Sequence, residues 1–173
     1  MLEVISTRRS AVRIAALLGA TSIAFTSAAE MSTEEMRSLM EGVYSLQEWR
    51  QDGKVLTPPT VDGRTVHIDG SIVFIIHRGE GDEKLTVAQF GNYTFDGSVY
   101  SYGYQNCVRL LESPSGVKVT RNCPWTGMRS FVVTADGDLV HMRSTGGQEF
   151  RISKDNMTYS DGKVTRVWRR ERK

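Results

Sequence analysis

Motifs for the common catalytic chemistries are missing from this 173-residue chain. It has no Gly-x-Ser-x-Gly elbow, no Gly-rich phosphate loop, no His-Glu-x-x-His pair and no Asp-rich calcium loop. Proline is scarce, with four residues, and no Pro-, Gly- or Ser-rich run marks a linker. These absences argue against the familiar hydrolases, nucleotide-binding enzymes and calcium proteins, and they favour a single domain.

A long uncharged run occurs only near the N-terminus. Three arginines between residues 8 and 13 precede the segment 14–29, which ends in small residues. We therefore expect residues 1–29 to be an export signal peptide, 30–173 to be the mature domain, and the protein to be periplasmic or secreted. The run is too short and too rich in Ala, Ser and Thr to predict a membrane span. The Arg8-Arg9 pair leaves both twin-arginine and general secretory export open.

The charge gives no sign of a nucleic-acid partner. Removing residues 1–29 takes away three arginines and one glutamate, so Lys+Arg falls from 22 to 19 and Asp+Glu from 20 to 19. A formally neutral domain lacks the concentrated positive surface that phosphate binding needs. One basic cluster remains, which we interpret as a solvated strand edge and tail. It contains Arg166, Arg169, Arg170, Arg172 and Lys173.

Asp-Gly pairs, which favour tight hairpin turns, are frequent. They occur at 52–53, 62–63, 69–70, 96–97, 136–137 and 161–162. The segments between them are rich in Val, Ile, Phe, Tyr and Thr, and many alternate apolar with polar residues. We therefore expect an all-β fold: an antiparallel up-and-down β-barrel of about 8–10 strands whose interior can hold one small molecule.

The expected elements can be placed along the chain. Residues 32–35 form a capping-box pattern, and Met36, Leu39 and Met40 follow at helical spacing, so a short N-terminal helix should lie across one end of the barrel. The strand candidates are 43–49, 64–68, 71–78, 85–95 in one or two pieces, 98–104, 107–111, 117–120, 128–134, 139–143, 149–152, 157–160 and 164–169.

The two cysteines are expected to form a disulfide. If residues 113–116 make a hairpin loop, Glu112 pairs with Val117, and this register brings Cys107 within one residue of Cys123. A redox or metal-binding pair is the alternative, but no Cys-x-x-Cys spacing supports it. The histidines also lack ligand spacing, so we expect no metal and no cofactor.

Four segments resemble the bacterial lipocalin-like domain family, which are small β-barrels of the calycin type. They are EGVYSL at 41–46, GNYTFDG at 91–97, RSFVV at 129–133 and VWRR at 167–170. The resemblance implies a lipocalin-like barrel over the mature chain with a cup-shaped cavity for an apolar or aromatic small molecule. It implies no common catalytic motif.

Candidate site residues come from the tyrosines and histidines. Tyr100, Tyr102 and Tyr104 alternate, so in a strand they form one aromatic face, which either lines the cavity or packs outside. His77 shares its parity with Val73 and Ile75 at the end of the most hydrophobic run, which favours a place in the cavity, although a solvated rim position is the alternative. Either His67 or His141 could face solvent.

The sequence therefore predicts a protein that binds a small hydrophobic or aromatic molecule in its lumen. The ligand-binding candidates are His77, Tyr93, Tyr100, Tyr102, Tyr104, Arg129 and His141. A second hypothesis is a cofactor-independent lyase or isomerase that uses His77, Tyr102 and Arg129 for acid-base chemistry. A third is a structural envelope protein without a ligand.

Overall fold

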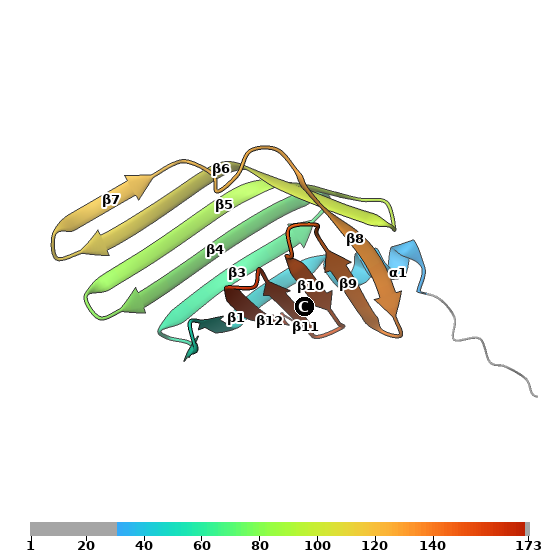
Figure 1. The fold of residues 1–173 in the computed structure, drawn as a ribbon, viewed down its shortest axis with the longest axis horizontal. Helices are drawn as coiled ribbons and strands as arrows, with labels where there is room; N and C mark the ends of the chain where they lie inside the picture. Colours follow the sequence, from blue (N-terminus) through green and yellow to red (C-terminus); the bar gives the residue numbers. More distant parts are fainter. Residues whose placement is uncertain (1–30, 172–173) are drawn as a thin grey trace, which may run out of the picture.

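The computed structural model describes residues 31–171, which fold into one helix and one antiparallel sheet of twelve strands (Figure 1). The helix is α1 (Thr33–Met40). The strands are β1 (Gly42–Gln51), β2 (Lys54–Leu56), β3 (Val61–Ile68), β4 (Ser71–Glu80), β5 (Glu83–Phe95), β6 (Val99–Ser113), β7 (Gly116–Thr120), β8 (Arg129–Asp136), β9 (Leu139–Arg143), β10 (Glu149–Ile152), β11 (Asn156–Ser160) and β12 (Val164–Arg170).

Ten of these strands close into a barrel because β12 pairs with β1 as well as with β11. The order around the ring is β1, β3, β4, β5, β6, β8, β9, β10, β11 and β12, while β2 is added beside β1 and β7 beside β6. The ring therefore follows the chain order, and every pairing is antiparallel. The predicted up-and-down barrel is confirmed, and its strand number lies within the expected range.

Five of the six Asp-Gly pairs lie at turns, as expected. At the turn between β3 and β4, Asp69 and Gly70 both have positive φ, at 48° and 75°, which suits the twist of a tight hairpin. The pair at 62–63 lies inside β3 instead. Gly63 faces the barrel interior, where an added Cβ would lie 2.5 Å from the carbonyl oxygen of Ile75. Close packing, and not a turn, explains this glycine.

The strands β4 to β7 extend beyond the ring, to the left in Figure 1. The predicted strands 98–104 and 107–111 are one continuous strand, β6, which is irregularly paired with β5 between Phe90 and Gly91. At Gly91 an added Cβ would lie 1.9 Å from the Gly103 carbonyl oxygen. The two paired strands therefore approach each other more closely there than a side chain at this position would permit. Beyond this point both faces of the sheet carry exposed residues, with Val108 on one face and Arg109 on the other.

The cysteine prediction is confirmed. Glu112 pairs with Val117 as the hairpin register requires, and Cys107 in β6 is bonded to Cys123 just after β7, with 5.1 Å between their Cα atoms. The bridge fastens the β6–β7 extension to the segment that leads back to β8.

Helix α1 covers one end of the barrel, also as expected. Ser32 and Glu35 form the predicted capping box, and Met36 and Met40 are buried in the main hydrophobic core. A guanidinium nitrogen of Arg37 donates to the carbonyl oxygen of Phe95 at 2.9 Å, which ties the helix to the end of β5. Among the described residues, no helix is both long and apolar enough to cross a membrane. The predicted signal peptide, 1–29, lies outside the described residues.

Candidate functional site: a cavity inside the barrel

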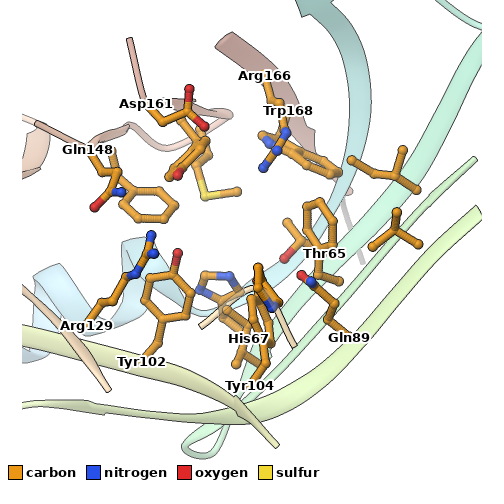
Figure 2. A pocket seen from close by; sticks show the side chains of 18 of the residues that line it. Thr65, His67, Gln89, Tyr102, Tyr104, Arg129, Gln148, Asp161, Arg166 and Trp168 are labelled. Carbon is orange, nitrogen blue, oxygen red and sulfur yellow. The ribbon is translucent and has the colours of Figure 1, made fainter. Parts of the chain in front are cut away.

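The barrel holds an internal cavity of about 300 Å³ (Figure 2). Inward-facing side chains of most ring strands line it, because alternate residues of each strand point to the lumen. Its apolar lining consists of Trp49, Ile72, Phe74, Ile76, Leu85, Val87, Pro124, Trp125, Phe150, Met157 and Trp168. Its polar lining consists of Thr65, His67, Arg78, Gln89, Tyr102, Tyr104, Arg129, Gln148, Asp161 and Arg166, together with Tyr159.

The floor of the cavity lies at the end that α1 covers, which we call the closed end. His67 of β3 is 3% exposed there and packs against the rings of Tyr44, Tyr93 and Tyr100. Burial lowers the pKa of His67 to about 4, because the imidazolium would lose its hydration among aromatic rings. His67 is therefore neutral near pH 7. In the described part of the chain its ring nitrogens have no hydrogen-bond partner, and the side chain borders the cavity.

Aromatic residues of β6 form one wall. Tyr102 and Tyr104 both line the cavity and stand edge-on to each other, with 5.6 Å between their ring centroids. Tyr102 also meets Phe131, Phe150 and Trp125. Burial raises the pKa of both tyrosine hydroxyls well above the usual value, so both remain protonated donors. The wall suits a flat apolar ligand that also accepts a hydrogen bond.

The opposite end of the cavity carries cationic side chains and two tryptophans, and we call it the open end. It comprises Trp49, Arg78, Trp125, Arg129 and Arg166.

Arg166 of β12 is the most buried of these cations. Its guanidinium carbon lies 4.7 to 5.2 Å from the ring centroids of Trp49, Tyr159 and Phe74. Its Nε is buried and has no hydrogen-bond partner among the described residues. Burial lowers the pKa of Arg166, although a guanidinium remains charged in proteins. The close contacts of this cation are thus with rings, and the Asp161 carboxylate acts on it through its charge without forming an ion pair.

Arg129 begins β8 and lies over the Trp125 ring, with 3.9 Å from its guanidinium carbon to the ring centroid. Figure 2 shows Arg129 and Arg166 on different walls, with Tyr102 beside Arg129. Both guanidinium groups lower the pKa of Tyr102 and of Tyr159 through their charge, although burial outweighs that effect. The two cations therefore act on the same part of the lumen.

Most of the sequence-predicted tyrosines and Arg129 are found inside the barrel. Tyr102, Tyr104 and Arg129 line the cavity. Tyr93 and Tyr100 are buried in the packed core of the closed end and are not among the lining residues. The hydroxyl of Tyr93 donates to the Glu41 carboxylate at 2.6 Å, and burial raises its pKa to about 12. These two tyrosines support the floor.

The prediction that His77 points into the lumen is wrong. In β4 the buried residues are Ile72, Phe74 and Ile76, so His77, one residue on, faces outward and is exposed, with its Nδ1 3.0 Å from the Thr86 hydroxyl. Both faces of this strand are apolar, so the alternation of its residues does not show which face turns inward. His141 also lies on the outer side of its strand, because the neighbouring Val140 and Met142 are buried.

The sequence-based prediction missed most of the lining residues, His67 and Arg166 among them. His67 could have been found from β3 itself, where Asp62 and Arg64 alternate with it and mark the opposite face as solvated. Arg166 was assigned to a solvated cluster, but it faces the lumen. Arg170 of the same cluster is not a solvated tail either, since its Nη2 donates to the Ser38 carbonyl at 2.7 Å. Charge alone does not reveal an inward-facing arginine.

The described residues contain no group of three or more His, Cys, Asp or Glu side chains that could hold a metal ion. Comparison with protein-family models, with curated proteins and with solved structures finds no match to this chain. The fold and the cavity therefore define the class: a closed antiparallel β-barrel with one covered end and an internal cavity that aromatic, aliphatic and polar side chains line.

Proposed function

We propose that the protein is a lipocalin-like barrel that binds a small hydrophobic or aromatic molecule in its lumen. The observation that carries the proposal is the cavity, whose lining combines aromatic and aliphatic side chains with polar and charged ones. Ligand sites in proteins combine apolar walls with polar groups that fix the orientation of the ligand, and their volumes are roughly 300–1,000 Å³. At about 300 Å³ the cavity suits a molecule of two or three rings.

Two further features support binding over a structural role. The interior is not filled by side chains, and a barrel without a ligand would gain stability from closer packing. The hydroxyls of Tyr102 and Tyr104 border the cavity without a hydrogen-bond partner among the described residues. Polar groups placed this way can orient a bound molecule.

The acid-base hypothesis receives less support. His77, on which it was built, is on the outer surface, and burial holds His67 neutral and Tyr102 protonated near pH 7. Among the described residues, the cavity lining then offers mainly donors and cations, with Asp161 as its carboxylate.

We propose that binding takes place outside the cytoplasm. The Cys107–Cys123 disulfide fits an oxidising compartment, and the N-terminal segment has the pattern of an export signal.

Tryptophan fluorescence offers a direct test, since all three tryptophans line the cavity. Titration with N-phenyl-1-naphthylamine, a neutral fluorescent probe, should show saturable energy transfer from tryptophan at one equivalent. Val87→Phe fills part of the lumen and should weaken binding about tenfold or more. The control Val132→Phe adds the same bulk to an exposed position on β8 and should have no effect. Equal binding by both variants would place the probe outside the barrel and contradict the proposal.

A further inference from the structure

We infer that the ligand carries an acidic group, a carboxylate on an aromatic or apolar body, and that Arg129 and Arg166 bind this group. The inference rests on the proposed function and adds the chemical class of the ligand. It starts from the charges that face the cavity.

Three arginines and one aspartate line the cavity. Arg78 has partners, since Glu80 lies 3.7 Å away and the Gln51 side chain accepts from it at 3.4 Å. Asp161 uses its Oδ1 to accept from the backbone nitrogens of Lys163 and Val164 in the turn before β12. The lumen therefore holds an excess of positive charge.

Arg129 and Arg166 carry that excess. Among the described residues neither makes an ion pair or a hydrogen bond, and their contacts are with aromatic rings. Both side chains are partly buried, and the Asp161 carboxylate acts on Arg166 through its charge without forming an ion pair. A partly desolvated charge without a hydrogen-bonded partner is unfavourable, and rings compensate it only in part. The Nε of Arg166 is the specific donor that lacks an acceptor, because it is buried from solvent and no acceptor of the described residues lies within hydrogen-bond distance of it.

A carboxylate meets both needs at once. It accepts hydrogen bonds from guanidinium groups in a matching planar geometry, and it neutralises the charge. Tyr102 lies beside Arg129 and can donate a further hydrogen bond (Figure 2). The rest of the lumen, with Phe74, Phe150 and Trp168, accommodates an uncharged body. The acidic group would lie at the open end and the apolar body toward His67.

A matched pair of ligands tests the inference by isothermal titration calorimetry. The probes are 2-naphthoate and 2-naphthamide, which share size and shape and differ in charge at pH 7. The wild-type protein should bind the acid about tenfold or more tightly than the amide, as hydrogen bonds between charged groups imply. Arg166→Gln and Arg129→Gln should each reduce the affinity for 2-naphthoate about tenfold and leave that for 2-naphthamide nearly unchanged.

Arg169→Gln is the control, because Arg169 is the exposed, outward-facing neighbour on β12 and should leave both affinities unchanged. Equal affinities for acid and amide in the wild type, an equal loss of both in the two variants, or no binding of 2-naphthoate would overturn the inference. The neutral probe N-phenyl-1-naphthylamine separates this failure from that of the proposed function, since it tests the lumen without any charge.

Discussion

The two ends of the barrel differ in how they treat inward-facing arginines. Arg166 and Arg170 lie four residues apart on the same face of β12. At the closed end, the Nη2 of Arg170 donates to backbone carbonyls of Ser38 and Leu39, at 2.7 and 3.2 Å, and also to that of Glu41. At the open end, Arg166 has ring contacts only, within the described residues. The same side chain thus supports the fold at one end and remains available to a ligand at the other.

The neighbouring aromatic residues differ in the same way. At the closed end the Tyr44 side chain is fully buried, and its hydroxyl donates to the Leu39 carbonyl at 2.6 Å. At the open end Trp49, on the same strand, borders the cavity and lies against Arg166 and Arg78. We therefore expect mutations at the closed end to lower stability and mutations at the open end to change binding.

The largest effect is expected for the aromatic pair on β1. Tyr44→Ala should lower the free energy of unfolding by about 4 kcal/mol, because it removes a buried ring and leaves a cavity in the core. Trp49→Ala should cost less than half as much, since the Trp49 side chain already borders open space, but it should weaken binding of N-phenyl-1-naphthylamine. Urea unfolding followed by circular dichroism gives both stabilities. Equal losses would remove the distinction between the two ends.

The arginines of β12 give the next largest effect. Arg170→Gln should lower stability by about 2 kcal/mol, because the carbonyl groups at the end of α1 lose charged donors. Arg166→Gln should leave stability unchanged or raise it slightly, since it removes a largely desolvated charge that makes no ion pair or hydrogen bond among the described residues. The same unfolding measurement compares the two variants. A loss of about 2 kcal/mol for Arg166→Gln would show that its ring contacts hold the fold together.

A smaller effect, and one that depends on pH, is expected for His67. Its pKa is about 4 in the folded protein and about 6.5 when unfolded, so the unfolded state binds more protons between these values. Stability should therefore fall as pH falls, and His67 should account for a loss of about 2 kcal/mol between pH 7 and pH 5. The loss should be absent in His67→Gln.

His141→Gln is the control for this measurement, because His141 lies on the outer side of β9. Urea unfolding at both pH values should give it the wild-type decrease. If His67→Gln and the wild type lost equal stability between pH 7 and pH 5, His67 would be hydrated or paired in the folded protein.

Local chemistry allowed most of the fold to be predicted. The Asp-Gly turns, the capping box at 32–35 and the pairing of Glu112 with Val117 each depend on residues close in sequence, and all are found in the structure. The exception at Gly63 arises from contact with β4, which only the folded sheet brings close.

The site was less predictable because it depends on which strand face turns inward and on ring closure. In β4 both faces are apolar, and Phe74, not Ile75, turns inward. Arg166 meets Trp49 because β12 pairs with β1, which closes the ring between the last and the first long strand. No local pattern specifies that contact.

A crystal structure of the protein grown with 2-naphthoate would test the central claim most directly. We predict the ring system in the lumen against Tyr102 and Phe150, with the carboxylate within hydrogen-bond distance of Arg166 and Arg129. An empty lumen with 2-naphthoate bound to the outer face of the β6–β7 extension, or a carboxylate directed at His67, would contradict the account.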